Sequence, residues 1–219
     1  MSNTDSFIDE VTEEVRRDRL FAMMRRYGWI AVVGVVGLVG LAAYNEYSKA
    51  QSEAAAQAAG DSIQAALESS EPESRAAALA DARATIDSDA RYLADFMRAG
   101  ELFDVGDIDG AIAILTPMTT DAMLDPVYRD LALLKSTMIG ASTMAPDVRI
   151  AKLASIAAAG APYRLLAEEQ IAAAQIEMGE TEAAIGGLRA IISDAEVSDG
   201  LRRRALQMIV ALGGDPDAG

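Results

Sequence analysis

The sequence contains no cysteine and no histidine. Without cysteine the chain has no disulfide bonds and no thiol nucleophile. Without histidine it lacks the side chain that most often serves as a general base or a metal ligand near neutral pH. A folded domain in this chain must therefore be held together by its apolar core alone.

Basic residues are also in short supply. The chain has 19 lysines and arginines against 34 acidic residues, which gives a net charge of −15. Contacts between basic side chains and phosphates supply most of the affinity for nucleic acid, and an acidic surface is repelled by anionic lipid headgroups. We therefore expect no nucleic-acid partner. The simplest role of the charge is to keep the domain soluble.

Patterns that indicate catalysis are missing as well. The serine and threonine hydroxyls have no histidine to activate them, and no glycine-rich phosphate loop of the required spacing occurs. Asp104, Asp107 and Asp109 loosely resemble a calcium loop. An EF-hand, however, would need a glycine at Asp109 and a glutamate at Leu115. A solvated turn with helix-capping acids explains them better, so we expect no enzymatic activity, cofactor, metal or small-molecule substrate.

One apolar run stands out, RRYGWIAVVGVVGLVGLAAYNEY at residues 25–47. No residue between Gly28 and Tyr44 is charged, and a helix of this length, about 25 Å, reaches the short end of a bilayer span. Aromatic residues of the kind found at membrane interfaces flank it on both sides: Tyr27, Trp29, Tyr44 and Tyr47. We predict a transmembrane helix over residues 27–47, in preference to a buried core helix.

A cleaved signal peptide is the stronger alternative for this run, because Gly40 and Ala42 could form a small-x-small cleavage site. Signal peptides begin with a short basic leader, whereas about 26 residues precede this run and six of them are acidic. Five arginines also precede it, and Lys49 is the only basic residue between it and Arg75. The positive-inside rule places the N-terminus in the cytoplasm and the rest of the chain in the periplasm, across a bacterial inner membrane.

The segments around the run complete the predicted organisation. Residues 1–26 carry apolar residues at helical spacing and are expected to form a cytoplasmic tail with a short amphipathic helix. Residues 48–88 read as an alanine-rich helical connector, interrupted near Pro72. A repeat domain is expected over residues 89–213, and a disordered tail over residues 214–219.

Three glycines, Gly34, Gly37 and Gly40, fall on one side of the predicted membrane helix. Such a smooth face lets another helix approach closely, which makes these residues candidates for helix packing. The plainer explanation is that glycine is simply frequent in membrane helices.

The chain repeats itself after residue 90. Residues 92–118 and 165–191 align without gaps at an offset of 73. A further unit lies between them, beginning at Asp125 and with a second helix after Pro146, and a period near 35 residues is typical of helix-pair arrays. The matching positions are Ala99 and Ala172, Gly106 and Gly179, Asp107 and Glu180, Ala111 and Ala184, Ile112 and Ile185, and Leu115 and Leu188.

Each unit has a simple physical interpretation. A helix ends at Gly106 or Gly179, where a positive φ closes the turn, and the next residue is an acid suited to a helix N-terminus. Ala111 or Ala184 then lets the second helix pack closely. We predict an all-α fold in which a single N-terminal transmembrane helix precedes an α-solenoid of about three helix pairs. A closing helix would carry a polar face with Arg202, Arg203 and Arg204.

The pattern A-x₆-G-[DE]-x₃-A-x₃-L in residues 99–115 and 172–188 resembles the tetratricopeptide (TPR) repeat. The resemblance is partial, because Asp95 and Glu168 stand where a large aromatic residue is expected. The middle unit also has GASTMAP in place of the glycine–acid turn. The peptide-clamp residues of that family therefore do not transfer to this chain.

The layout of the whole chain resembles the YfgM-like family, an ancillary subunit of the bacterial Sec translocon. The resemblance implies a single-pass inner-membrane protein whose periplasmic TPR-like domain contacts translocon subunits, periplasmic chaperones or nascent chains. An alternative is a scaffold or assembly factor for another inner-membrane complex, respiratory or cell-division, docked through the glycine face.

In a TPR-like array the first helix of each unit lines a concave surface. An apolar groove ringed with acids would suit a peptide with basic and hydrophobic residues. The alternative is that the aromatic side chains here belong to the core. The positions predicted to bind protein are Leu93, Phe96 and Phe103 in the first unit, with Leu166 and Ile176 in the third, where Glu169 takes the place of Phe96.

Overall fold

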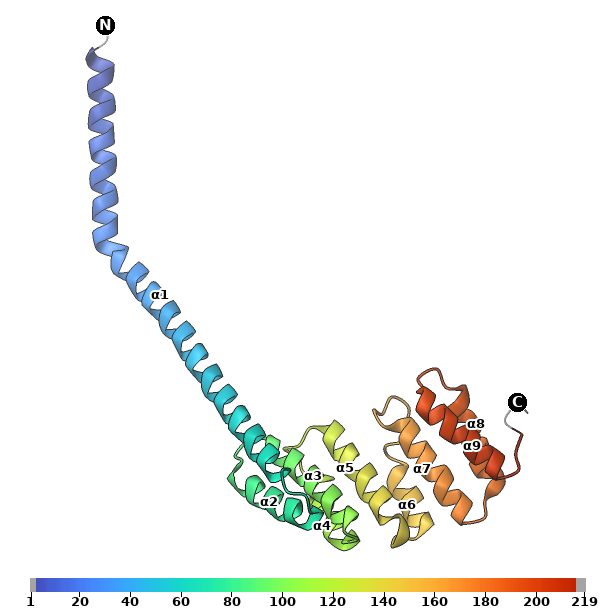
Figure 1. Cartoon of the computed structure of the whole chain (residues 1–219). Coiled ribbons are helices and arrows are strands. Elements are labelled where there is room, and N and C mark those ends of the chain that lie inside the picture. The colour runs from blue at the N-terminus through green and yellow to red at the C-terminus, as the bar shows by residue number, and fades with distance from the viewer. Residues whose placement is uncertain (1–2, 216–219) are drawn as a thin grey trace. The chain divides into compact units, whose positions relative to one another are not determined.

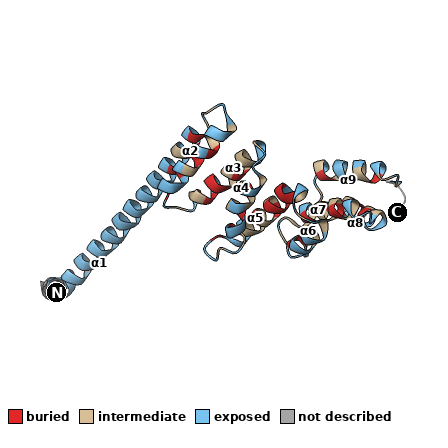
Figure 2. Cartoon of the chain, turned by 90° about the horizontal axis from the view of Figure 1, so that it is seen from below, coloured by how far each residue is buried: buried red, intermediate tan, exposed pale blue. Residues whose placement is uncertain are grey.

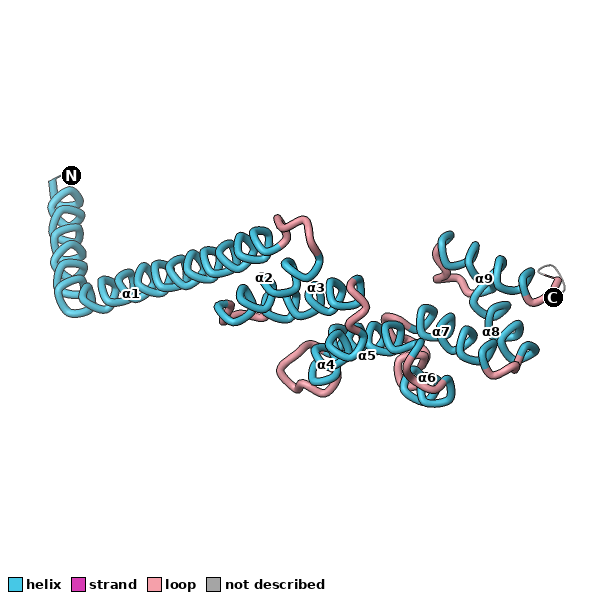
Figure 3. The backbone as a smooth tube through the Cα atoms, turned by 60° about the horizontal axis from the view of Figure 1, so that its bottom comes forward, coloured by secondary structure: helices cyan, strands magenta, loops and turns pink. Residues whose placement is uncertain are grey.

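The computed structural model describes the backbone of residues 3–215, and the side chains from residue 21 onward except those of residues 22 and 31. Over this range the chain forms helices and loops and no strand (Figure 3). The all-α prediction is therefore confirmed. The apolar pattern predicted for residues 1–20 and the last four residues of the predicted tail lie outside the described side chains. The chain divides into two compact units, residues 1–57 and 58–219.

The first unit is a single helix, the greater part of α1 (Asn3–Ala66). Among the described residues, α1 is the one helix long and apolar enough to cross a membrane, with a mean hydropathy of 1.9 over its most apolar window. None of that window is buried against the rest of the chain, and α1 is exposed over most of its length in Figure 2. This exposure distinguishes the helix from the core helix of a soluble protein, which packs on its neighbours.

The second unit begins with the last turns of α1, which pack against α2 (Pro72–Thr85) and α3 (Ala90–Asp104). Ala59 and Ile63 of α1 are buried there together with Leu79 of α2 and Ala94 of α3. The stretch from residue 58 to residue 86 is thus part of the folded core. A packed helix pair, formed by the end of α1 and α2, precedes the three units recognised in the sequence.

The three predicted helix pairs follow in order, and each helix contacts the next one along the chain (Figure 1). This packing of successive pairs is the nearest-neighbour arrangement of a solenoid. The pairs are α3 with α4 (Ile108–Met118), α5 (Pro126–Ile139) with α6 (Pro146–Leu153), and α7 (Arg164–Glu177) with α8 (Thr181–Ser193); a short 3₁₀ turn η1 (Gly140–Ser142) follows α5, and α9 (Asp199–Ala211) closes the array.

The glycine turns predicted from the sequence are confirmed. Gly106 has φ +81° and Gly179 has φ +78°. The residue after each glycine donates its N–H to a carbonyl of the preceding helix, Asp107 to Leu102 at 2.8 Å and Glu180 to Gln175 at 2.9 Å. This is the Schellman arrangement that ends a helix at a residue of positive φ.

The small and large core residues also take their predicted places. Ala111 and Ala184 are fully buried in the cores of their pairs, and Leu115 and Leu188 fill the same cores one turn later. The buried alanine allows the close approach of the helices, and the leucine restores the volume needed for dense packing.

The middle pair departs from the expected length. The sequence predicts a second helix through residues 147–159, but α6 ends at Leu153. The chain then turns, so that Ile156 enters the core with Leu134 and Leu153. Gly160, with φ +82°, follows, and such a residue does not continue a helix.

Structural equivalence at an offset of 73 residues continues beyond residues 92–118 and 165–191, the segments that align in sequence. Asp125 caps α5 by accepting a hydrogen bond from the Val127 N–H, and Ser198, 73 residues later, caps α9 by accepting one from the Leu201 N–H. Ala132 and Ala205 are also equivalent and fully buried. The closing helix α9 therefore occupies the place of the first helix of another pair.

The arginines of α9 were expected to form a polar outer face. Arg202 donates to the Ile192 carbonyl at the end of α8, and Arg204 binds Glu169 of α7. Arg203 and Arg204 are both exposed, as the predicted polar face requires, whereas Arg202 is half-buried. Two of the three arginines hold the last helix onto the array.

Candidate protein-binding site

A cavity of about 330 Å³ opens between α3 and α5, the first helices of the first two units. These are the helices that the sequence predicted to carry a binding surface. The lining is mostly apolar and comes from the heads of the two helices and the residues just before them: Asp89, Ala90, Tyr92, Leu93, Phe96, Leu124, Asp125 and Tyr128.

The lining residues differ in how much they serve the core. Tyr92 and Leu124 are buried and belong to the core of α3, α4 and α5. Phe96 is half-buried against the same core. Leu93 and Tyr128 are 53% and 50% exposed, so these two side chains have apolar surface that contacts nothing in the chain. The cavity thus combines a fixed base with two free apolar side chains.

Tyr92 is held by polar contacts at its hydroxyl. It donates to Oδ2 of Asp121 at 2.6 Å and accepts from Nη2 of Arg91 at 3.0 Å. The Arg91 guanidinium also lies 4.7 Å from the centre of the Tyr92 ring, within the range of a cation–π contact. The Tyr92 hydrogen bond, with the Met123 N–H, lowers the pKa of Asp121. These contacts fix one wall of the cavity before any partner arrives.

The rim of the cavity is acidic. Asp89 and Asp125 are both exposed, and no lysine or arginine lines the cavity. Asp125 uses one carboxylate oxygen to cap α5 at 3.0 Å from the Val127 nitrogen. Arg91, which stacks on Tyr92 outside the lining, attracts Asp89. The two acids still outnumber this one cation, so the cavity mouth favours positively charged groups.

A second cavity, of about 440 Å³, lies at the equivalent place in the third unit. It is lined in part by residues that stand 73 positions after those of the first cavity. This correspondence shows that each 73-residue period builds a cavity between the heads of two first helices. The shared positions are Pro162, Tyr163, Leu165, Leu166, Ser198 and Leu201.

The position equivalent to Phe96 does not line the second cavity. It is Glu169, whose carboxylate accepts two hydrogen bonds from Arg204 at 2.6 and 2.7 Å. The Glu169 side chain is only 8% exposed, which makes it a paired structural group instead of a free groove acid. This pair raises the pKa of Arg204. The third unit thus has a charged contact where the first has an aromatic face.

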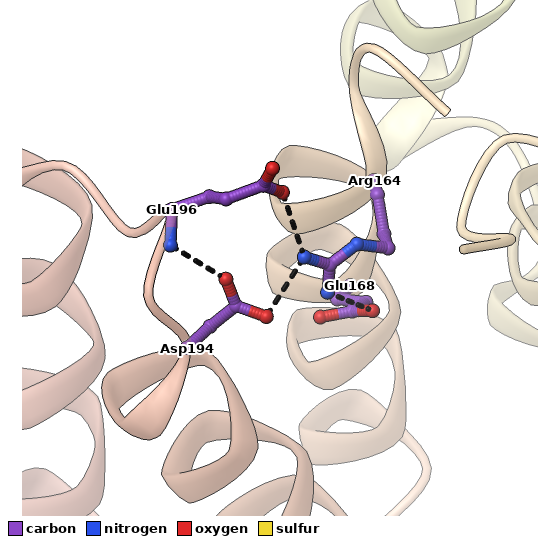
Figure 4. A network of polar contacts seen from close by, with 4 residues as sticks. All are labelled: Arg164, Glu168, Asp194 and Glu196. Atoms are coloured by element: carbon purple, nitrogen blue, oxygen red, sulfur yellow. Dashed lines mark hydrogen bonds and ion pairs between the residues drawn. The ribbon is translucent and has the colours of Figure 1, made fainter. Parts of the chain in front are cut away.

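Arg164 binds three acids around the second cavity (Figure 4). It donates to Asp194 at 2.7 Å, to Glu196 at 3.2 Å and to Glu168 at 3.3 Å. The bond to Asp194 contributes most to the raised pKa of Arg164. The pKa of Asp194 is lowered first by the Glu196 N–H and then by Arg164. This network ties the loop between α8 and α9 to the head of α7.

The predicted binding residues separate into three groups. Leu93 and Phe96 line the first cavity and Leu166 the second. Phe103 is 47% exposed near the end of α3 and lines neither of these two. Ile176 is partly buried against the core of α7, α8 and α9.

The predicted helix-packing glycines have open space around them. A side chain at Gly34, Gly37 or Gly40 would meet no atom of the chain within 4 Å.

Several lining residues were not among the predicted sites. Leu124 and the two rim acids come from loops before helices, where apolar periodicity carries no signal. Tyr92, Tyr128 and Tyr163 stand near the start of the three units but are not at equivalent positions. At the 73-residue offset Tyr163 corresponds to Ala90, and Tyr92 corresponds to Leu165. The offset of 73 residues relates whole segments, and it is this offset that pairs the lining positions of the two cavities.

Comparison with known families agrees with this architecture. A family model described as a tetratricopeptide repeat-like domain matches residues 25–185. The chain belongs to this family. The matched region of the TPR-like chain begins in the apolar stretch of α1 and ends within α8. Comparisons with curated proteins and with solved structures gave no match.

Membership in the TPR-like family bears directly on the type of function. Stacked helix pairs of this kind are typically protein-interaction modules, and no catalytic family is indicated. The first helices of a solenoid line an extended surface that serves binding. The cavity between α3 and α5 lies on two such helices and is the candidate site of the TPR-like domain.

Proposed function

We propose that the protein is a membrane-anchored adaptor whose TPR-like domain binds segments of other proteins in the cavity between α3 and α5. The observation that carries this proposal is the pair of free apolar side chains, Leu93 and Tyr128, beside the fixed base formed by Tyr92 and Leu124. Covering this apolar surface with a partner removes it from water, which lowers the free energy of the complex.

The location that fits the sequence best is the bacterial inner membrane. In this proposal residues 1–26 form a cytoplasmic tail, residues 27–47 span the membrane and the TPR-like domain lies in the periplasm. The exposed apolar helix supports the anchor, and the arginines before it support the orientation.

The proposed partners are subunits of the Sec translocon, together with periplasmic chaperones or nascent chains. The support is the likeness to the YfgM-like layout, in which an acidic tail, one anchor and degenerate TPR units follow each other. An adaptor held beside a translocation channel would meet emerging polypeptides that still expose apolar residues.

A photo-crosslinking amino acid at Leu93 tests the adaptor function. In native membranes that contain the full-length chain, we expect ultraviolet light to join Leu93 to translocon subunits, chaperones or emerging chains, identified by mass spectrometry. The matched control is the same amino acid at Met138, which is 47% exposed on α5 outside the cavity. Equal capture of the same proteins at both positions, or no capture at Leu93, contradicts the proposal.

A second candidate function is a scaffold or assembly factor for a respiratory or cell-division complex. The spacing of Gly34, Gly37 and Gly40 along one side of the helix favours it, because small residues let membrane helices pack closely. Replacing all three by leucine should abolish co-purification of such a complex and leave the Leu93 crosslinks in place. Loss of the Leu93 crosslinks with unchanged complexes would instead link the glycines to the adaptor function.

A reporter fused after Gly219 tests the topology. Alkaline phosphatase is expected to be active there and a reporter that works only in the cytoplasm to be silent. Sequencing the N-terminus of the mature chain then separates an anchor from a signal peptide. A mature chain that begins near residue 43 would exclude the anchor.

A further inference from the structure

We propose that the segment bound between α3 and α5 presents a bulky apolar side chain next to a lysine or arginine. This inference rests on the proposed adaptor function and adds the chemistry of the bound segment. It follows from the size of the cavity, the apolar character of its lining and the exposed acids at its rim, which are taken in turn below.

The size limits what can enter. The cavity of about 330 Å³ is at the lower end of the roughly 300–1,000 Å³ typical of ligand pockets. Such a volume accepts one or two side chains of an extended or helical segment, not a folded domain. The partner is therefore recognised through a short stretch of its chain.

The lining selects an apolar side chain. Phe96 and Tyr128 expose ring surface, and Leu93 has more than half of its surface in solvent. A polar side chain placed among these three would lose its hydrogen bonds to water without gaining new ones. Burial of an aliphatic or aromatic side chain at the same place is favourable, because its apolar surface leaves water.

The rim selects a cation. In the described part of the chain, the Asp89 side chain does not cap α3, and Asp125 accepts a hydrogen bond from the Val127 N–H through one oxygen. Both carboxylates are exposed, and no basic side chain lines the cavity. A lysine or arginine of the bound segment would find two exposed carboxylates beside the apolar cavity, and the charge of Asp89 is partly offset by Arg91.

The equivalent cavity of the third unit provides an internal comparison. There Arg164 already binds Glu196 and Asp194, and Pro162 and Ser198 replace the two rim acids. Glu196, the acid that lines that cavity, is thus already paired with Arg164 of the same lining. We therefore expect the preference for a cationic segment at the first cavity and not at the second, although both cavities arise from the same repeat.

Peptide binding to the full chain in lipid nanodiscs tests the inference. The probes are fluorescently labelled ten-residue peptides of glycine and serine with a central Leu-Lys pair, and the readout is fluorescence anisotropy. Matched peptides carry Ser-Lys, Leu-Gln or Leu-Glu. We expect the order Leu-Lys, Leu-Gln, Leu-Glu from strongest to weakest, each charge step changing affinity by about two- to fivefold. We expect Ser-Lys to bind weakly if at all.

Variants of the rim locate the effect. Asp89→Asn with Asp125→Asn removes both charges, and asparagine is as good a helix N-cap as aspartate, so the fold is retained. We expect this variant to bind Leu-Lys and Leu-Gln peptides equally, which shows coupling in a double-mutant cycle. The control variant Asp81→Asn with Asp104→Asn removes two exposed charges elsewhere, and the preference for lysine should remain.

Leu93→Ser tests the apolar half of the proposal. We expect it to weaken Leu-Lys binding by about threefold or more, as the loss of part of a leucine's burial implies. Met138→Ser, an exposed residue of α5 outside the cavity, should have no effect. Coupling that fades as salt is raised would further support a charge contact at the rim.

The outcomes separate this inference from the adaptor function. Equal affinity for Leu-Lys and Leu-Glu, with loss on Leu93→Ser, overturns the charge preference and keeps the adaptor function. Absence of peptide binding together with specific Leu93 crosslinks in membranes also overturns the inference alone. Absence of both peptide binding and crosslinks overturns the two proposals together.

Discussion

Glu169 and Arg204 join α7 to α9 through two hydrogen bonds of 2.6 and 2.7 Å. Charge-assisted pairs with two parallel bonds are among the stronger polar contacts in proteins. The equivalent positions 73 residues earlier, on α3 and α5, are Phe96 and Leu131. The same two repeat positions therefore hold a polar contact in one period and apolar residues in the other.

Removing the arginine should destabilise the end of the array. Arg204→Leu leaves the nearly buried Glu169 carboxylate without its cation, and we expect a loss of about 1–3 kcal/mol in the free energy of unfolding. The double variant Glu169→Phe with Arg204→Leu copies the first period and should recover most of this loss. Urea denaturation of the full chain in detergent, followed by circular dichroism, measures both. A double variant less stable than Arg204→Leu would contradict the equivalence of the two positions.

The glycine turns provide a test with an internal control. Gly106→Ala and Gly179→Ala place a side chain at φ +81° and +78°, which should cost about 1–2 kcal/mol each. Gly100→Ala lies inside α3 with no atom within 4 Å of the new methyl group, and should stabilise the domain by about 0.5–1 kcal/mol. Urea denaturation again gives the values. Equal effects at Gly100 and Gly106 would show that conformation is not the cause.

Lowering the pH should reduce the free energy of unfolding, because two aspartates bind residues at the start of first helices. Asp121 binds Tyr92 of α3, and Asp194 binds Arg164 of α7. The pKa of Asp121 and that of Asp194 lie below the ordinary value of 3.8 in the folded chain. The stability that they contribute is therefore fully present above pH 3.8 and is lost as the pH falls through their lowered values. Asp121→Asn and Asp194→Asn should each reduce the difference in urea midpoint between pH 6 and pH 3.

Tyr92→Phe should act in the same direction as Asp121→Asn, because the Tyr92 hydroxyl is the main cause of the lowered pKa of Asp121. Asp81→Asn serves as the control, since Asp81 is exposed on α2. If Tyr92→Phe leaves the difference in urea midpoint between pH 6 and pH 3 unchanged, this hydrogen bond does not contribute to the pH dependence of stability.

The end of α1 should behave as part of the folded core. Ile63 is 6% exposed and packs with α2 and α3, so Ile63→Ala should cost about 2–5 kcal/mol. Ile30, in the apolar part of the same helix, is 50% exposed, and Ile30→Ala should leave the urea midpoint unchanged. A similar loss in both variants would contradict the division of α1 at residue 57.

The glycine turns and the alanine–leucine core could be predicted because each depends on residues within one helix pair. The positive φ at Gly106 follows from a local pattern, and the burial of Ala111 and Leu115 follows from helical spacing. The early end of α6 could not be predicted, since Ile156 turns inward to meet a core made partly by α5 and α7.

The candidate site was predictable only in part. Leu93 and Phe96 were found because the first helix of each unit in a TPR-like array lines the binding surface. The role of Glu169 was missed because its partner Arg204 is 35 residues away and no local pattern links the two. The buried Arg149 and its ion pair with Glu177, 28 residues away, were missed for the same reason.

The equivalence of α5 and α9 has a consequence for how this array can change in length. Asp125 and Ser198 are interchangeable junctions, each followed by a helix that packs on the pair before it. A deletion of one whole period at these junctions would place Arg204 opposite Phe96, and a duplication would place Glu169 opposite Leu131. The number of cavities could thus shrink or grow, in evolution or in the laboratory, once this one pair of positions is matched.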